Sequence, residues 1–572
     1  MAAAVFGRAL RRHHYPAVRR HALLSTATTQ PPDAKSHERW LRLVPSCVLM
    51  NCAGSVFATG PILTPELTRL FGAVAPASGD WALASLLPMQ SAFAVGSAGV
   101  LFALGGAMDR AGPGKSCLGA AAAGAAGTAV YCAGLEAHSL PLLYASYAAL
   151  SGSAFGLVYG SVVPTVQKWF PDRKGVASSV CAAAFGTGAF VWAPIYTALL
   201  EAFRSAPAAA YGAATKTVDG VRYAEVAPGD WREAVLATAA DLAAAGQPAL
   251  EPGLFLVGSG NTGVVEAVFL GGALHAACTA VAGLGVRAPE RAVHAAAAPA
   301  AAAAAAGRGV ASPEGLGLAA GIFFAGFTAL PLMLNSKMML TDIFSPFAEA
   351  DLFAGAAVAS YIGTMSLANS AGRLTIGPLS DAVSLRAAYA LCGLQIPLVL
   401  ALPSIAAAAP ADPAAAAAAW KAATCAIPAF YGGYVVLLAP AVATAFGTDR
   451  VGAVFPKIFA VLNLSNLASA AVVGSLRDGA ATRAAAELAG HVDDGAFLGA
   501  FGAPKAELPA LLAAKTATIP QLVALLPDRA AVPDPSPFLY HDALHAFAAT
   551  STLAFACHAG ALAYASKRPP GS

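Results

Sequence analysis

The sequence predicts an all-α integral membrane protein with twelve transmembrane helices in two pseudo-symmetric six-helix bundles. Three observations lead to this fold class. Of the 572 residues, 57% are hydrophobic and 11% are charged, whereas a soluble domain typically has about 25% charged residues to form its polar surface. Uncharged runs long enough to cross a ~30 Å hydrocarbon core recur along the chain. A low-complexity segment divides these runs six and six.

Each uncharged run is a candidate span, because a helix needs about 20 apolar residues to cross the bilayer. The first six lie at 43–65, 82–108, 116–135, 139–167, 175–200 and 267–286, the last extended upstream past Glu266. The second six lie at 315–336, 352–372, 387–411, 422–448, 458–476 and 543–566.

The domain organisation follows from these runs. We expect a basic tail or transit peptide at 1–40, a bundle at 41–286, an Ala-rich cytosolic linker at 287–314, a second bundle at 315–566 and a tail at 567–572. Each bundle has one long polar loop insertion between its fifth and sixth spans, at 201–255 and at 477–541. A duplicated six-helix unit would leave this correspondence, and such repeats are common in transporter folds.

The first residues contain five arginines and no acid before Asp33. This composition is typical of an organelle transit peptide, and equally of a basic cytosolic tail. Lys and Arg in the short loops place both ends of the chain on the inner side. The sequence therefore predicts a multi-pass protein of the plasma membrane or of a mitochondrial or plastid inner membrane.

Several classes of function do not fit the composition. A net charge of +3 is too small and scattered for a nucleic-acid partner. Nine cysteines lie almost entirely in apolar runs without paired spacing, which favours small buried residues over metal or disulfide roles. No phosphate-binding G-x-x-x-x-G-K-[ST] loop is present, so ATP is not the expected energy source. Without a nucleophile–base or metal constellation, we expect no enzyme, no metal and no cofactor.

A G-x-x-x-D frame followed by basic residues occurs at the same place in each half. The copies read GGAMDRAGPGK after the second span and GPLSDAVSLR after the eighth. The predicted gating residues are Gly105, Asp109, Arg110, Lys115, Gly377, Asp381 and Arg386. A small residue lets two membrane helices approach closely. A carboxylate at a helix end can meet the N-terminal dipole of a neighbouring helix in one state and lose that contact in another.

Twelve spans in two halves with this repeated loop resemble the major facilitator superfamily, over about residues 40–566. Four segments narrow the resemblance to the oxalate:formate antiporter and monocarboxylate-porter-like branch: GLVYG at 156–160, WFPDRKGVASS at 169–179, FGTGAF at 185–190 and NSAGRLTIGPLSD at 369–381. WFPDRKG, between spans four and five, is the most specific of them. The resemblance implies a secondary active transporter in which two bundles rock about a central cavity by alternating access.

Arg373 lies in the inner half of span eight, where a charge is costly and normally faces a partner or a wet cavity. The resemblance implies that this arginine binds the substrate carboxylate, for which a planar guanidinium is suited. An interfacial arginine extending to the membrane surface is the alternative. Tyr159 and Gln90 are further candidate substrate-binding residues, although helix packing would explain both.

The substrate class follows from one missing cation. Dicarboxylate carriers of the branch have a lysine that would fall at about Leu462, and the nearest lysine, Lys457, lies on a different helix face. One buried cation matches one carboxylate, so we expect a monocarboxylate of the pyruvate, lactate or formate type. A proton or a counter-anion is the expected co-substrate, in a monomer embedded in the lipid bilayer. The alternatives are a carrier of dicarboxylate, nitrate or sugar, or a receptor or sensor of the same fold.

Overall fold

The structure is a computed structural model of the chain. It describes residues 36–565 except 82, 87, 219–220, 238–240, 243–244, 248, 290–309, 349–354, 502, 514–518 and 528–531. Most of the predicted basic tail and most of the Ala-rich linker therefore lie outside the described residues. The chain forms two units, Met1–Arg42 and Leu43–Ser572, and the site described below lies in the second.

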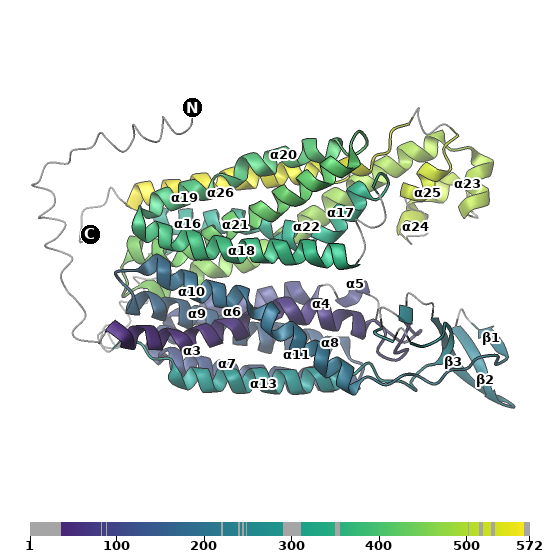
Figure 1. Cartoon of the computed structure of the whole chain (residues 1–572), viewed down its shortest axis with the longest axis horizontal. Coiled ribbons are helices and arrows are strands. Elements are labelled where there is room, and N and C mark those ends of the chain that lie inside the picture. The colour runs from purple at the N-terminus through teal and green to yellow at the C-terminus, as the bar shows by residue number, and fades with distance from the viewer. Residues whose placement is uncertain are drawn as a thin grey trace, which may run out of the picture. The chain divides into compact units, whose positions relative to one another are not determined.

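Helices of the first half follow the predicted spans (Figure 1). They are α3 (Ser36–Gly54), α4 (Val56–Leu67), α5 (Leu83–Leu86), α6 (Met89–Ala111), α7 (Pro113–Glu136), α8 (Leu140–Ala145), the π-helix η1 (Ser146–Ser151), α9 (Gly152–Trp169), α10 (Lys174–Gly186), α11 (Gly188–Phe203) and α13 (Val264–Gly285). The first span is thus divided at Ser55 and the fifth at Thr187. Glycines let the two helix breaks pack closely against each other, since a Cβ at Gly188 would lie 2.6 Å from the Gly54 Cα.

The first insertion is a small antiparallel sheet in the order β1-β2-β3-β4. Its strands are β1 (Thr215–Val218), β2 (Val221–Ala227), β3 (Asp230–Ala237) and β4 (Gly253–Leu256). Thr215 pairs with Ala224, Tyr223 with Glu233 and Ala234 with Leu256. The polar composition predicts an insertion here, but the strand alternation was not recognised from the sequence.

Helices of the second half repeat the pattern of the first. They are α16 (Pro313–Leu334), α17 (Ser336–Phe344), α18 (Gly355–Ala382), α19 (Leu385–Cys392), α20 (Gln395–Ala407), α21 (Pro413–Phe446), α22 (Val451–His491) and α26 (His541–Ala565). Between the last two lie α23 (Asp494–Phe501), the 3-10 helix η3 (Lys505–Glu507), α24 (Leu508–Ala513), α25 (Ile519–Ala524) and the 3-10 helix η4 (Ser536–Phe538). The second insertion is therefore helical.

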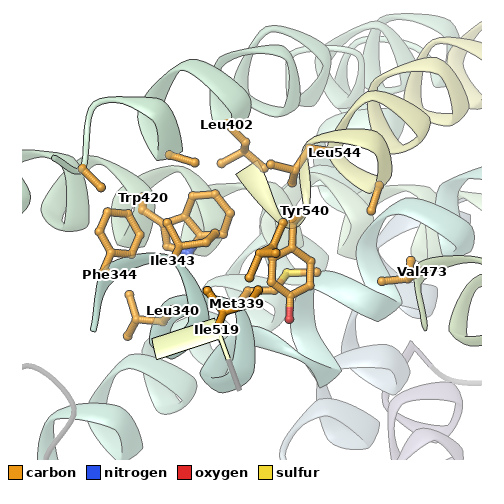
Figure 2. Packing of buried hydrophobic residues seen from close by; sticks show 14 of the residues in the cluster. Met339, Leu340, Ile343, Phe344, Leu402, Trp420, Val473, Ile519, Tyr540 and Leu544 are labelled. Carbon is orange, nitrogen blue, oxygen red and sulfur yellow. The ribbon is translucent and has the colours of Figure 1, made fainter. Parts of the chain in front are cut away.

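The second insertion packs into the core of its half (Figure 2). Ile519 and Leu522 are buried in one apolar cluster with Met339, Trp420 and Tyr540. The helix α22 continues past the predicted end of its span at 476, because the following residues are rich in Ala, Arg and Glu, which favour helix although they are not all apolar. A charged residue therefore ends the apolar run from which a span is predicted, but the helix itself continues.

Ten helical segments of the described residues are long and apolar enough to cross a membrane. The predicted span 43–65 and the described part of 352–372, from residue 355, are also helical and correspond to α3 with α4 and to α18. Because α18 reaches Ala382, both Arg373 and Asp381 lie within one continuous helix. We call the helix ends near Asp109 and Asp381 the inner end, and the ends that carry the two insertions the outer end.

Candidate functional site

The second of the predicted gating aspartates, Asp381, binds the N-terminus of a helix from the other half. Its carboxylate accepts hydrogen bonds from the backbone N–H groups of Gly175 at 2.9 Å and Val176 at 2.8 Å. These are N–H groups of the first turn of α10, which have no partner within their own helix and lie at the positive end of its dipole. This is the type of contact that the sequence motif suggests.

The first gate aspartate, Asp109, lies in the equivalent place. It forms an ion pair with Lys168 at 2.5 Å, in which the side chains are 15% and 6% exposed. Its carboxylate also lies against Gly452 in the first turn of α22, so closely that a Cβ on this glycine would overlap it. Each aspartate therefore reaches the beginning of a helix from the opposite half.

Small residues let the two halves approach to backbone contact at the inner end. A Cβ at Gly175 would overlap the carbonyl oxygen of Gly377, and one at Gly105 would lie 3.2 Å from the Pro456 Cβ. Pairs α6 with α22 and α10 with α18 are the most extensive contacts between the halves. Close packing of small residues is what stabilises helix contacts in a membrane. The inner end is closed in this structure.

Both helices that receive an aspartate begin with the same short sequence. Asp172-Arg173-Lys174-Gly175 precedes the body of α10, and Asp449-Arg450-Val451-Gly452 precedes that of α22. Only the first copy, within WFPDRKG, is part of the sequence resemblance described above. Its D-R-x-G spacing was the signal, because it recurs between the fourth and fifth spans of each half.

The WFPDRKG segment forms a tight connection between α9 and α10. The Gln167 amide nitrogen of α9 donates to the Lys174 carbonyl at 3.1 Å and to the Ser178 hydroxyl. The Trp169 Nε1 donates to the Arg287 carbonyl oxygen at 2.7 Å, just after α13. These contacts fix the position of the N-terminus of α10 that binds Asp381.

Basic residues of the motif do not all lie beside its aspartates. The Arg386 guanidinium donates to the Leu562 carbonyl oxygen at 3.1 Å, near the end of α26. Arg110 and Lys115 make no ion pair within 4 Å among the described residues. Lys168, which the motif did not include, is the cation that pairs with Asp109.

We expect Lys168→Met to lower the transport rate by about tenfold or more, because it leaves the Asp109 carboxylate largely buried without its cation. Exchange of substrate by the reconstituted protein measures this. The neighbouring Arg110→Met is the matched control and should retain most of the activity. Equal losses in the two variants would contradict a specific role for the Lys168 ion pair.

Arg373 lies at the contact between the two halves, deeper than the gate aspartates. It is 6% exposed. Its Nε donates to Asn369 Oδ1 at 2.8 Å, one turn away on α18, and its Nη1 donates to the Ala182 carbonyl oxygen of α10 at 3.2 Å. The guanidinium also lies 5.5 Å from the centre of the Phe185 ring. A buried cation thus connects the halves through contacts that do not neutralise it.

An aromatic layer lies next to this arginine. Tyr159 stacks on Phe459 with ring centres 4.1 Å apart, and it meets Phe185 edge to face at 5.5 Å. A cavity of about 10 Å³ remains beside Tyr159, which is space for about one water molecule. Binding of a substrate here therefore requires the halves to separate.

Gln90 lies away from this centre. It is the second residue of α6, near the outer end, and its amide donates to the Tyr147 hydroxyl at 3.2 Å. A Cβ at Gly60 would lie 2.8 Å from the same amide nitrogen. The structure brings Arg373 close to Tyr159, but it joins Gln90 to neither of them among the described contacts.

Short stretches of the chain are similar to curated transporters, and no family model matches it. It is 41% identical over 63 residues to the oxalate:formate antiporter of Oxalobacter formigenes, which is 11% of this chain and 15% of the antiporter. It is 34% identical over 73 residues to the apicoplast pyruvate carrier 1 of Toxoplasma gondii, 13% of each chain. It is 37% identical over 70 residues to the mouse monocarboxylate transporter 12, which is 12% of this chain and 14% of that transporter. The matches thus span about a seventh of each relative.

Solved structures establish the fold over most of the chain. The proton:xylose symporter XylE aligns over 91% of this chain and 94% of its own, with TM-score 0.53 and 11% identity. The transporter FucP in its outward conformation aligns over 76% of this chain and 92% of its own, with TM-score 0.51 and 13% identity. The chain therefore has the major facilitator superfamily fold, which confirms the predicted fold class and a multi-pass membrane protein. All these proteins are transporters, in agreement with the prediction that the chain is not an enzyme.

Proposed function

We propose that the chain is a secondary active transporter of a small organic anion, a monocarboxylate of the pyruvate, lactate or formate type. Arg373 is the observation that carries this proposal. It is buried at the contact between the halves, and among the described residues its hydrogen bonds go to a side-chain amide and a backbone carbonyl. A carboxylate would supply the charge that these neutral acceptors lack.

The number of cations supports one carboxylate rather than two. The position expected for a second cation is Leu462, which is 6% exposed and packs towards Gly326 of α16. Lys457, on the same helix, has its ammonium group 5.9 Å from the Phe102 ring centre. The neighbourhood of Arg373 is otherwise aromatic, with Phe185 and Tyr159, and a second carboxylate there would be buried without a cation.

The proposed alternating access is supported by where the halves make contact. The inner end is held by the hydrogen bonds of Asp381 to α10 and by the packing of Asp109 against Gly452 of α22, and α10 lies along α18 up to Gly186, whose Cβ would be 2.7 Å from the Ser370 hydroxyl. Beyond the division at Thr187, α11 packs instead against α4 and α13 of its own half. We infer that the substrate reaches Arg373 from the outer end once the halves separate there, and that release at the inner end requires the contacts of the two aspartates with the opposite half to break.

A counterflow screen with the reconstituted protein tests the proposed function. Vesicles preloaded with an unlabelled monocarboxylate should accumulate labelled pyruvate, lactate or formate from the outside solution. Loading with oxalate, nitrate or a neutral sugar should support much slower exchange. Fastest exchange with one of these three solutes would replace the proposed substrate class, and absence of flux for all solutes would favour a receptor or sensor.

We expect Tyr159→Phe to raise the KM for the transported anion by about three- to tenfold, which corresponds to one hydrogen bond of ~1 kcal/mol. The ring would keep its stacking on Phe459, so folding and maximal rate should change little. Concentration-dependent uptake measures the KM. An unchanged KM would assign the Tyr159 hydroxyl to helix packing.

A further inference from the structure

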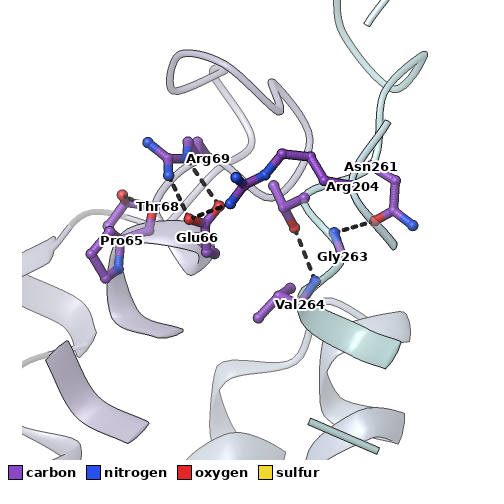
Figure 3. A network of polar contacts seen from close by, with 9 residues as sticks. Pro65, Glu66, Thr68, Arg69, Arg204, Asn261, Gly263 and Val264 are labelled. Carbon is purple, nitrogen blue, oxygen red and sulfur yellow. Dashed lines mark hydrogen bonds and ion pairs between the residues drawn. The ribbon is translucent and has the colours of Figure 1, made fainter. Parts of the chain in front are cut away.

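At the outer end of the first half, a buried acid joins the first helix to the fifth (Figure 3). Glu66, the penultimate residue of α4, accepts from Arg204 Nη2 at 3.1 Å and from Arg69 Nη2 at 2.6 Å. The side chains of Glu66 and Arg204 are 7% and 14% exposed. Arg204 immediately follows α11, so this ion pair connects the outer ends of two helices that are far apart in the sequence.

The sixth helix is included through the backbone. Ser205, next to Arg204, forms reciprocal backbone hydrogen bonds with Asn261, at 2.9 and 3.1 Å. The Asn261 side chain donates to Glu266 Oε1 in the first turn of α13. The two ends of the first insertion are thus held together where they leave the helices.

The second half contains the same arrangement with different residues. Asp342, near the end of α17, accepts from Arg477 Nη2 at 2.9 Å and from the Tyr540 hydroxyl at 2.7 Å. Arg477 lies on α22, one residue beyond the predicted fifth span of this half, and Tyr540 directly precedes α26. First, fifth and sixth helices of the second half meet at this carboxylate.

The two clusters occupy equivalent places in the repeat. In each half the acid lies on the short outer helix of a divided first span, α4 after Ser55 and α17 after Asn335. In each half the arginine lies where the insertion begins. Since the two acids differ and neither lies in a shared sequence motif, this equivalence becomes visible only when the helices are placed in space.

We propose that Glu66–Arg204 and Asp342–Arg477 are paired outer clamps, each of which fixes the movable outer part of a first helix to the fifth helix of the same half. A short helix separated from the rest of its span by a break could bend on its own. The clamp opposes this, because loss of one partner would leave a charge in a partly or fully buried place. The outer end then closes by movement of each half as one unit, with its insertion attached.

Hydrogen exchange of the full-length protein in lipid nanodiscs, followed by mass spectrometry, tests the clamps without any substrate. Asp342→Asn should raise amide exchange in α17 by about tenfold and leave α4 unchanged, since local opening sets the exchange rate. Glu66→Gln should do the reverse. The matched control is Asp478→Asn, because Asp478 pairs with the same Arg477 at 3.2 Å but its side chain is 73% exposed.

Exchanging the charges separates the ion pair from a general packing effect. The double variant Asp342→Arg with Arg477→Asp should restore protection of α17 to within about twofold of the parent chain. If Asp342→Asn does not fold, Tyr540→Phe, which removes one hydrogen bond and keeps the ion pair, should raise exchange in α17 to a smaller extent. Exchange in α17 equal to that of the parent chain in Asp342→Asn and Tyr540→Phe, or raised equally in both halves, would overturn the proposal.

Discussion

Replacing Arg373 with alanine is expected to reduce carboxylate uptake by about 100-fold or more. Truncation of one partner of a buried, hydrogen-bonded charge pair typically costs ~2–5 kcal/mol, and the bound anion would lose its buried cation. Arg373 is 6% exposed and is held in position by its hydrogen bond to Asn369. Water therefore cannot readily take the place of the guanidinium group in the alanine variant. Initial rates of labelled pyruvate, lactate and formate uptake into proteoliposomes measure the effect.

Two further variants define the role of Arg373. Arg373→Lys keeps the charge but loses the planar fork and the hydrogen bond from Nε, so a partial recovery is expected. Lys457→Ala is the matched control, because this lysine lies on α22 and its ammonium group is 5.9 Å from the centre of the Phe102 ring. Uptake that is unaffected by Arg373→Ala would remove the central argument for an anion site.

Replacing Gly175 with valine is expected to prevent closure of the inner end and to reduce transport to a few per cent of the parent rate. A Cβ at this position would overlap the Gly377 carbonyl oxygen, which belongs to backbone and cannot rotate away. The clash would also displace the N–H group that binds Asp381. Overpacking of a tight contact typically costs ~1–3 kcal/mol, enough to change the populations of two states about 5- to 150-fold.

Cysteine accessibility measures the state of the inner end directly. Ser179→Cys places a thiol against Gly377, and it should react with a water-soluble maleimide faster in the Gly175→Val background. Gly124→Val on α7 is the matched control, because a Cβ at Gly124 meets no atom within 4 Å. If Gly175→Val transports as well as Gly124→Val, the backbone contact is not required for closure.

The sequence alone predicts the membrane spans and the two aspartates of the repeated motif. Apolar runs of span length are imposed by the bilayer itself, and the G-x-x-x-D frame occurs twice at equivalent places. The extent of helices was harder to predict. The sequence places Asp381 after span eight, whereas in the structure it lies within α18. The helix extends beyond the apolar run from which the span is predicted.

Contacts between distant residues could not be predicted from the sequence. Nothing in the order of residues indicates that Lys168 pairs with Asp109, or that Arg204 and Arg477 join the first helix of their halves. Such ion pairs depend on how helices rotate and cross, which the spacing of apolar residues does not determine. Gln90 illustrates the same limit, since its position on α6 near the outer end follows from the register of the helix.

The reciprocal placement of the aspartates makes the inner contact bivalent. Asp109 of the first half packs against Gly452 at the start of α22, while Asp381 of the second half accepts hydrogen bonds at the start of α10. One helix-terminal carboxylate contributes only about 1 kcal/mol, so either contact alone would dissociate readily. Because the rigid halves connect the two, formation of the first raises the effective concentration for the second. The two contacts together then keep the inner end closed and can still be broken one after the other, as the proposed transport cycle requires.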